Sequence, residues 1–365
     1  MAQHILITGG AGFIGRRVAE TLLHDGHRVR ILDSLIDQVH GEAADTPHQD
    51  AELLVGDLRD GAIVARALRG IDKVVHLAAE VGVGQSMYAV ERYVSVNDVG
   101  TAVLFEQLAK RPVERVVTAS SMSIYGEGLY RDADGALVQD AERRLAAGFD
   151  PVDAQGRPLS PEPTPEWKRP TLSSVYALTK YVQERLTLTL APAYGMEGVC
   201  LRLFNVYGPG QALSNPYTGV LAIFASRLLN NERPAIFEDG EQRRDFVHVD
   251  DVARAFAVAL EHPAAVGEVF NIGAGEERTV AAIATRLAEA MGRPDLTPEI
   301  IGKARIGDIR HCFADTRKAA TVLGFKPMRD FDEGLVALAG WVAQQRATDR
   351  VGQARLELES RGLVA

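Results

Sequence analysis

The chain has 365 residues, 46% of them hydrophobic, which is enough for one or two domains with a sizeable core. Its formal net charge of −9 argues against nucleic acid or an anionic membrane surface as the main partner. The apolar stretches are too short to span a bilayer, and the first residues lead into a strand rather than a signal-type segment, so a cytoplasmic protein is expected.

A glycine-rich turn follows the first predicted strand, which covers residues 4–8. Gly9, Gly12 and Gly15 are spaced Gly-x-x-Gly-x-x-Gly, and residues 16–23 after them have a helical pattern. In a strand-turn-helix context the first glycine permits a tight turn, the second lets the backbone approach a pyrophosphate, and the third lets the helix pack on the strand. The motif therefore predicts a dinucleotide-binding site.

The second predicted strand, residues 27–32, is followed at once by Asp33. That acid lies about 20 residues past the glycines, where a carboxylate binds the adenosine ribose diol and repels a 2′-phosphate. The sequence therefore favours NAD over NADP. A further predicted strand, residues 52–55, is followed by Asp57, whose carboxylate could meet the adenine amino edge.

Strands and helices continue to alternate through the first half of the chain. Helices are predicted over 60–68 and 88–109, and strands over 73–79 and 114–119. This alternation predicts a doubly wound parallel α/β sheet with helices on both faces. Ligands of such sheets bind at the carboxyl ends of the strands, so the loop 80–87 is expected to approach a ligand.

A long, polar, proline-rich segment covers residues 126–172. Loops of this length are usually functional or disordered, and we interpret most of it as a surface excursion that covers the site in part or meets another subunit. The chain then enters a predicted helix that carries Tyr176 and Lys180, four residues apart and so on one helix face.

Tyr176 and Lys180 suggest acid-base chemistry. A free tyrosine hydroxyl has a pKa of about 10, and a nearby ammonium favours the phenolate, which can then exchange a proton with an alcohol or ketone. The alternative is a surface helix with a chance Tyr/Lys pair, but the dinucleotide motif upstream favours the functional interpretation.

The second half of the chain predicts a smaller α/β unit. Its predicted strands cover 200–204, 235–237 and 269–273, and its predicted helices cover 219–229, 252–261, 279–291 and 329–345. We expect an NAD-binding domain over 1–198 with returning segments near 240–275, a discontinuous substrate-binding domain over 199–345, and a tail over 346–365.

Two arginines of this half, Arg244 and Arg305, are candidates for binding a diphosphate, since a guanidinium binds phosphate through two parallel hydrogen bonds. Surface salt bridges are the alternative. Cys200 and Cys312 have no metal-ligand spacing, so we expect buried, reduced cysteines and no bound metal.

Eight short segments of the chain belong together. They are Thr8–Gly15, Asp57-Leu58, His76–Ala79, Ser120–Gly126, Tyr176 with Lys180, Leu203–Pro209, Arg243–Val249 and Arg305–Asp308. In combination they resemble the extended short-chain dehydrogenase/reductase family, and more narrowly its nucleotide-sugar epimerase/dehydratase branch. The resemblance covers residues 4–345 and implies a Rossmann fold, bound NAD and a nucleotide-sugar substrate.

The resemblance implies that Ser121, Tyr176 and Lys180 form the catalytic set. Ser121 would hydrogen-bond the reacting sugar oxygen, Tyr176 would act as acid and base, and Lys180 would lower the pKa of Tyr176 and hold the nicotinamide ribose. The implied NAD contacts are Gly9, Gly12, Phe13, Ile14, Gly15, Asp33, Asp57, Leu58, Leu77, Ala78, Ala79, Asn97, Tyr176 and Lys180. The implied substrate contacts are Val81, Ser121, Ser123, Tyr176, Asn205, Val220, Phe237, Arg244, Arg305 and Asp308.

Within this branch, the two residues after Ser121 indicate the reaction. The 4,6-dehydratases carry Asp-Glu there and the decarboxylases carry Glu at the second position, whereas this chain has Met122 and Ser123. The resemblance therefore implies 4-epimerisation, in which Tyr176 takes the proton of the C4 hydroxyl while a hydride moves to NAD. The 4-keto sugar then rotates, and the hydride returns to its other face.

The run Tyr207–Val220 and the long polar segment before Tyr176 look most like the enzymes that epimerise dTDP-L-rhamnose at C4. UDP-glucose or UDP-N-acetylhexosamine 4-epimerases and dTDP-4-ketosugar reductases are the alternatives, and a non-catalytic dinucleotide sensor is a third class. The resemblance also implies a homodimer built from the helices over 88–109 and 174–191.

Overall fold

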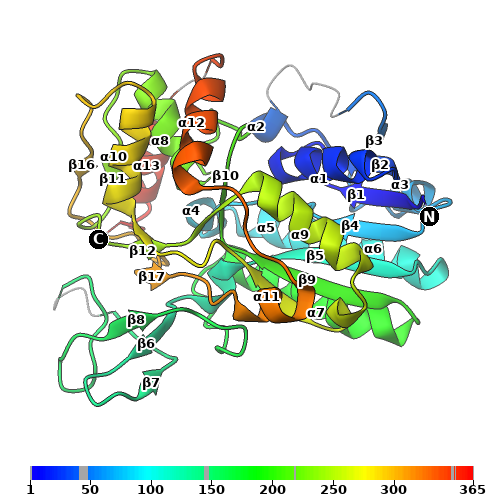
Figure 1. The fold of residues 1–365 in the computed structure, drawn as a ribbon, viewed down its shortest axis with the longest axis horizontal. Helices are drawn as coiled ribbons and strands as arrows, with labels where there is room; N and C mark the ends of the chain where they lie inside the picture. The colour runs from blue at the N-terminus through cyan, green and yellow to red at the C-terminus, as the bar shows by residue number, and fades with distance from the viewer. Residues whose placement is uncertain are drawn as a thin grey trace.

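The computed structural model describes residues 2–40, 48–143, 148–217, 219–346, 349 and 351–364. Its centre is a seven-stranded sheet in the order β14-β9-β5-β4-β1-β2-β3, in which all neighbouring strands are parallel (Figure 1). The strands are β1 (His4–Thr8), β2 (Arg28–Asp33), β3 (Glu52–Val55), β4 (Lys73–His76), β5 (Arg115–Ser121), β9 (Glu197–Leu203) and β14 (Val269–Ile272). The predicted doubly wound α/β fold is confirmed.

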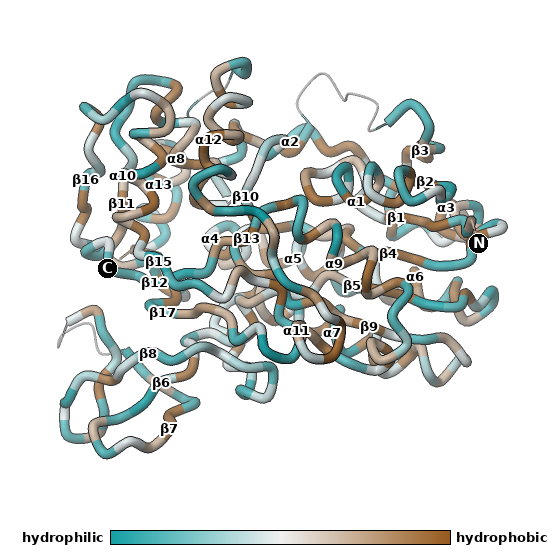
Figure 2. Tube along the Cα trace, in the orientation of Figure 1, coloured by the Kyte–Doolittle hydropathy of each residue, from teal (hydrophilic) through white to brown (hydrophobic). Residues whose placement is uncertain are grey.

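Helices cover both faces of this sheet, which explains why β4 and β5 in its middle are buried along their whole length (Figure 2). One face packs against α1 (Phe13–His24), α9 (Val249–Glu261) and α11 (Arg317–Leu323). The other face packs against α3 (Gly61–Ala67), α6 (Gly100–Lys110) and α7 (Val175–Ala193). The sequence analysis missed α11, a short helix that buries only Ala319 and Leu323.

The strand order places a topological switch point between β1 and β4. From β1 the chain builds β2 and β3 on one side, and then β4, β5, β9 and β14 on the other. Ligands of open parallel sheets bind in the crevice outside the carboxyl ends of the strands at such a point. Thr8 and His76 end these two strands, and Ser121 ends β5 beside them.

The helix predicted over 88–109 is interrupted. The structure has α5 (Val90–Tyr93), a π-helical segment (Val94–Val99) and then α6. Asn97 lies within the π-helical segment, and its side chain hydrogen-bonds to Glu80 and Thr179. A π-helical turn often marks a functional site, and here it turns a buried amide toward the loop after β4.

The smaller unit packs beside the carboxyl edge of the sheet, at the left of Figure 1. Its core is formed by α8 (Val220–Leu229), α10 (Val280–Ala290) and α12 (Phe331–Val342). Short strands pair around this core: β10 (Asn205–Tyr207) with β13 (Phe246–His248), β11 (Ala235–Ile236) with β16 (Glu299–Ile300), and β12 (Arg243–Arg244) with β15 (Arg278–Thr279) and β17 (His311–Cys312). The remaining short elements are α2 (Asp37–His40), α4 (Val83–Ser86), α13 (Val351–Ser360) and the 3-10 turns Met122–Tyr125 and Pro263–Ala265.

The long polar segment is more than a surface excursion. It contains an antiparallel sheet of β6 (Leu129–Arg131), β7 (Leu137–Val138) and β8 (Ser160–Glu162), which projects at the lower left of Figure 1. Strands of two or three residues carry no usable periodicity, which is why the sequence did not predict them. Residues 144–147 of this segment and Thr218 of the run Tyr207–Val220 lie outside the described residues.

Both cysteines are free and fully buried, as the sequence predicts. None of the helices in the described part of the chain combines the length and apolar character needed to cross a bilayer.

Candidate active site

A cavity of about 430 Å³ lies between the carboxyl edge of the central sheet and the smaller unit. Phe13 and Ile14 from the glycine turn line one part of it. All ten predicted substrate contacts line it as well, namely Val81, Ser121, Ser123, Tyr176, Asn205, Val220, Phe237, Arg244, Arg305 and Asp308. The structure therefore brings together residues that are spread over more than two hundred positions of the sequence. Their contacts with a ligand remain predictions.

Ser121 lines this cavity because it lies at the end of β5. Its hydroxyl oxygen accepts hydrogen bonds from the Ser123 hydroxyl at 2.9 Å and the Ser123 backbone N–H at 3.2 Å. With those two donors in place, its own proton is free to point toward the Tyr176 oxygen, with which Ser121 hydrogen-bonds. Ser123 thus orients Ser121, and Ser121 in turn contacts Tyr176.

Tyr176 lies in the first turn of α7. Ser174 caps this helix by accepting a hydrogen bond from the Ala177 backbone N–H at 3.1 Å, which fixes where the turn begins. The Tyr176 ring meets the Tyr93 ring edge-on, with the ring centroids 6.5 Å apart. Burial raises the pKa of Tyr176, and the hydrogen bond from Ser121 acts in the opposite direction by stabilising the phenolate.

Lys180 lies one turn further along α7, and its side chain is buried. Its ammonium donates a hydrogen bond of 2.7 Å to Gln183 Oε1, and burial lowers the pKa of Lys180 to about 8. Gln183 in turn donates to Thr101 and contacts His76. The expected lowering of the Tyr176 pKa by Lys180 remains a prediction.

His76 is a satisfied core residue, as expected for an apolar strand. One ring nitrogen contacts Thr8 at 2.7 Å and the other contacts Thr101 at 2.8 Å. Burial lowers the pKa of His76 to about 3, so the ring stays neutral and leaves Lys180 as the cation of this network.

The packing of the glycine turn requires glycine at Gly9 and Gly15. A Cβ on Gly9 would lie 2.8 Å from the Ala78 backbone, and a Cβ on Gly15 would lie 2.4 Å from the Gly9 carbonyl oxygen. Asp33, at the end of β2, accepts hydrogen bonds from the backbone N–H groups of Ala11 and Leu35. Although burial acts to raise the pKa of Asp33, hydrogen bonds from His40 and these two amides leave it below its usual value, so the carboxylate is ionised beside the turn.

Two predicted NAD contacts are engaged within the chain. Both amide hydrogens of Asn97 are donated, to the Glu80 carbonyl and the Thr179 hydroxyl, so Asn97 holds the loop after β4 against α7. Asp57 forms an ion pair of 2.6 Å with Arg59 at the surface. Direct cofactor contacts of these two side chains remain predictions.

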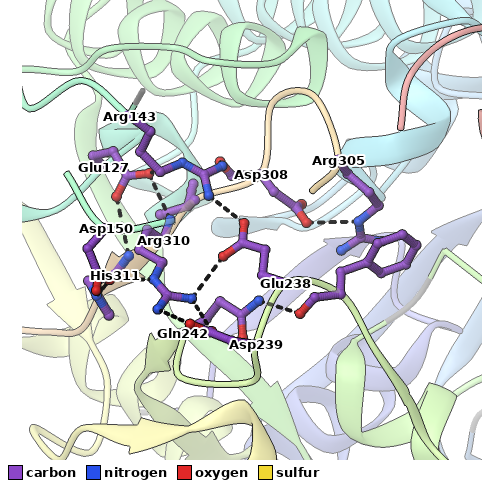
Figure 3. Close-up of polar contacts among 12 residues, drawn as sticks. Glu127, Arg143, Asp150, Glu238, Asp239, Gln242, Arg305, Asp308, Arg310 and His311 are labelled. Carbon is purple, nitrogen blue, oxygen red and sulfur yellow. Dashed lines mark hydrogen bonds and ion pairs between the residues drawn. The ribbon is translucent and has the colours of Figure 1, made fainter. Parts of the chain in front are cut away.

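The far end of the cavity carries the predicted diphosphate residues. Arg305 donates to Asp308 at 2.8 Å, and its guanidinium lies 4.6 Å from the centroid of the Phe237 ring (Figure 3). Arg244 donates instead to the backbone carbonyls of Ile309 and Arg310. Arg305 thus keeps nitrogens available to the cavity, whereas Arg244 mainly supports the chain around it.

Three amides in the cavity wall have unsatisfied atoms. Asn205 Nδ2, Gln211 Oε1 and Gln242 Oε1 are buried and have no hydrogen-bond partner among the described residues. Buried polar groups are normally hydrogen-bonded, and these three residues line one cavity, which favours a polar ligand there. Gln211 and Gln242 were not among the predicted site residues.

The C-terminal segment, predicted to be a tail, forms part of the cavity wall. Val351, Ala354, Arg355 and Leu358 of α13 line it. Glu357 accepts hydrogen bonds from the Tyr88 and Tyr217 hydroxyls, and the Leu363 carbonyl accepts one from the Ile306 backbone N–H, next to Arg305. The only hint in the sequence was the short Leu356/Leu358 patch, of which Leu358 is buried and Leu356 is exposed.

A second groove, of about 650 Å³, lies between α1 and α9 and includes Asp250, Arg254 and Glu261. None of the predicted site residues lines it. Its greater volume therefore does not make it the candidate active site.

Comparison with known proteins decides the family. Residues 5–273 match the model of the NAD dependent epimerase/dehydratase family. The chain belongs to this family. It is 36% identical over 350 residues to the dTDP-L-rhamnose 4-epimerase of Burkholderia thailandensis, covering 94% of this chain and 96% of that protein. It is 28% identical over 358 residues to a dTDP-glucose 4,6-dehydratase of Actinoplanes, covering 94% of this chain and 98% of that protein.

A crystal structure of a relative has a similar fold. The UDP-glucose 4-epimerase of Thermotoga maritima, solved with UDP-glucose, superposes with a TM-score of 0.77 at 32% identity, covering 93% of this chain and 99% of that one. As a member of the NAD dependent epimerase/dehydratase family, the chain is an enzyme that uses NAD. The glycine turn, in which a side chain at Gly9 or Gly15 would collide with backbone, and the ionised Asp33 beside it fit that cofactor.

Proposed function

We propose that the chain is a nucleotide-sugar 4-epimerase, with dTDP-L-rhamnose as its substrate and dTDP-6-deoxy-L-talose as its product. The observation that carries the proposal is the composition of the cavity wall. Tyr176 and Ser121 line it together with Phe13 and Ile14 of the glycine turn, and Arg305 and Asn205 belong to the same wall. Such a cavity suits a sugar alcohol joined to a diphosphate.

In the proposed epimerisation, different residues of the chain have different roles. NAD, when bound, accepts a hydride from a sugar carbon and can return it. Tyr176 takes the proton of the hydroxyl on that carbon and later gives it back, while Ser121 hydrogen-bonds the same oxygen. Arg305 and Asn205 hold the diphosphate end, which allows the sugar to present either face to the same reactive centre.

The wall also argues against a dehydratase. Removing water from the sugar needs an acid and a base in addition to Tyr176. Among the described residues that line the cavity, Asp308 is the one carboxylate, and it is paired with Arg305. The positions after Ser121 carry Met122 and Ser123, neither of which can serve as that pair.

The choice of sugar rests on resemblance to relatives. The relative that is 36% identical over nearly the whole chain carries the name dTDP-L-rhamnose 4-epimerase. A UDP-glucose or UDP-N-acetylhexosamine 4-epimerase is the second candidate, supported by the UDP-glucose 4-epimerase fold at 32% identity. A dTDP-4-ketosugar reductase is the third and differs from both in consuming reduced cofactor.

Purified protein tests these candidates directly. It is incubated without added cofactor with dTDP-L-rhamnose, dTDP-glucose, UDP-glucose and UDP-N-acetylglucosamine, and the products are followed by NMR. We expect inversion at C4 of dTDP-L-rhamnose and NAD released on denaturation. Turnover of UDP-sugars alone would select the second candidate, and strict dependence on added NADPH would contradict the epimerase proposal.

We further infer a homodimer. The helices predicted to form the interface expose Val90, Val94 and Val99 on one side and Leu178 on the other. Sedimentation should give twice the chain mass of 39.5 kDa. Substituting Val99→Glu together with Leu178→Glu should give a monomer, whereas Val336→Glu, at an exposed position on α12, should leave the dimer intact. A monomeric wild-type protein would contradict the inference.

A further inference from the structure

The long insertion between residues 127 and 172 contacts the segment that carries Arg305 and Asp308. This segment, residues 305–311, lies after β16 and ends with the first residue of β17. Arg305, Gly307, Asp308 and Ile309 of the segment line the cavity. Its conformation therefore decides where Arg305 and Asp308 lie in the cavity wall. Three side chains of the insertion, Glu127, Arg143 and Asp150, contact this segment (Figure 3).

Glu127 binds the backbone of the segment. Its two carboxylate oxygens accept hydrogen bonds from the backbone N–H groups of Arg310 at 2.7 Å and His311 at 3.2 Å. Asp150 accepts one from the Arg310 side chain at 2.7 Å and contacts the His311 ring at 3.2 Å. These four side-chain contacts, together with the hydrogen bond from the Gly128 backbone N–H to the His311 carbonyl, fix the C-terminal end of the segment.

Arg143 binds the middle of the segment. It donates a hydrogen bond of 2.5 Å to the Asp308 backbone carbonyl and another to Glu238, and its Nε lies 3.2 Å from Glu127. Glu238 directly follows Phe237, whose ring lies against Arg305. The Arg143 guanidinium therefore links the backbone at Asp308 to Glu238, the neighbour of Phe237. Arg305 contacts both Asp308 and Phe237.

Arg143 is mostly buried and neutralises nearby carboxylates, so replacing it is expected to be costly. Its side chain is 12% exposed, and Glu238 and Arg310 are each 1% exposed. Four carboxylates gather here, those of Glu127, Asp150, Glu238 and Asp239, and Arg143 and Arg310 are the arginines paired with them. Without Arg143, Glu127 would lose its paired arginine and Glu238 one of its two.

We propose that the insertion is a clamp for the substrate-facing segment 305–311, and that Arg143 is the positioning residue through which it sets the affinity for the nucleotide sugar. Arg143 does not line the cavity, so it acts through Asp308, Phe237 and Arg305 rather than by touching substrate. The proposal rests on the proposed function for the identity of the ligand. The contacts that form the clamp are present without any ligand.

The test compares Arg143→Met with Arg157→Met. Arg157 belongs to the same insertion, but its ion pairs, with Asp134 and Asp153, stay within it, and its side chain is 42% exposed. For Arg143→Met we expect the Kd for dTDP and UDP and the KM for the sugar nucleotide to rise about tenfold, which corresponds to about 1.4 kcal/mol. The value of kcat and the bound NAD should change less than about twofold. Arg157→Met should match wild type in all of these.

Hydrogen exchange gives a readout that needs no ligand. The backbone N–H groups of Arg310 and His311 should exchange faster in Arg143→Met than in wild type or Arg157→Met. Arg143→Lys keeps the charge but cannot make all three contacts at once, so it should fall between wild type and Arg143→Met. Unchanged exchange in this segment, or unchanged dTDP and UDP binding, would overturn the clamp. An equal loss of NAD, kcat and affinity would also overturn it, because it would indicate general unfolding.

These readouts separate the clamp from the proposed function. If wild-type protein epimerises none of the sugars offered, the proposed function fails. The exchange rates of the segment would still decide whether Arg143 holds it.

Discussion

Replacing Tyr176 by Phe is expected to lower kcat for epimerisation by a factor of about 10² to 10⁴, the usual contribution of a general acid-base group. Phenylalanine keeps the ring that packs edge-on against Tyr93 but removes the oxygen that hydrogen-bonds with Ser121. NAD binding should persist, because Phe preserves the shape of the first turn of α7. The measurement is single-turnover conversion of the active sugar nucleotide, with bound NAD quantified in parallel.

Tyr194→Phe provides the matched control. Tyr194 stands at the end of the same helix, where its side chain is exposed, and it should be replaced without effect on turnover. A Tyr176→Phe enzyme with full activity would remove this phenol from the mechanism. A variant without NAD would mean that Tyr176 supports the cofactor rather than the chemistry.

The central sheet and the predicted substrate residues could be inferred from sequence because both depend on strand ends. Apolar runs such as 73–76 are readable when both faces of a sheet are covered. Residues at or just after the ends of such runs, including Ser121 at the end of β5 and Asn205 after β9, must then lie at one edge of the sheet. Val81, Ser121, Ser123 and Asn205 line the cavity for this reason, whereas the other six substrate candidates reach it from helices or from the smaller unit.

The missed parts depend on contacts that a local pattern does not contain. Helix α13 buries only Ala354 and Leu358, and a helix of ten residues gains its stability from packing rather than from propensity. The insertion sheet has strands of two or three residues, and it is joined to the rest of the chain through bonds such as that from Gly128 N–H to the His311 carbonyl. The π-helical turn at Asn97 likewise follows from distant partners, Glu80 and Thr179.

These missed parts all adjoin the predicted site. Helix α13 supplies part of the cavity wall, the insertion holds the segment that carries Arg305, and Asn97 holds the loop that carries Val81. The site residues could therefore be predicted from the family pattern, whereas the elements that hold them in position became visible only in the structure.

Replacing Gly15 by Ala is expected to abolish most NAD binding. A helix-interior glycine normally gains up to about 1 kcal/mol of stability when it becomes alanine. At Gly15 the new Cβ would lie 2.4 Å from the Gly9 carbonyl oxygen and 2.5 Å from Gly10 Cα, and no side-chain rotation can relieve a clash with backbone. Helix α1 must therefore move away from the turn that binds the pyrophosphate.

Overpacking of this kind typically costs about 1–3 kcal/mol, which corresponds to a loss of roughly 5- to 150-fold in NAD affinity if the turn bears the strain. Gly340→Ala is the matched control, since Gly340 lies in α12 with no atom within 4 Å of the added Cβ, and it should raise the melting temperature slightly. Calorimetric titration of NAD into the apoprotein measures the effect. Wild-type affinity in Gly15→Ala would mean that α1 and the turn can separate without disturbing the cofactor, and the close packing at Gly15 would then have no role in binding.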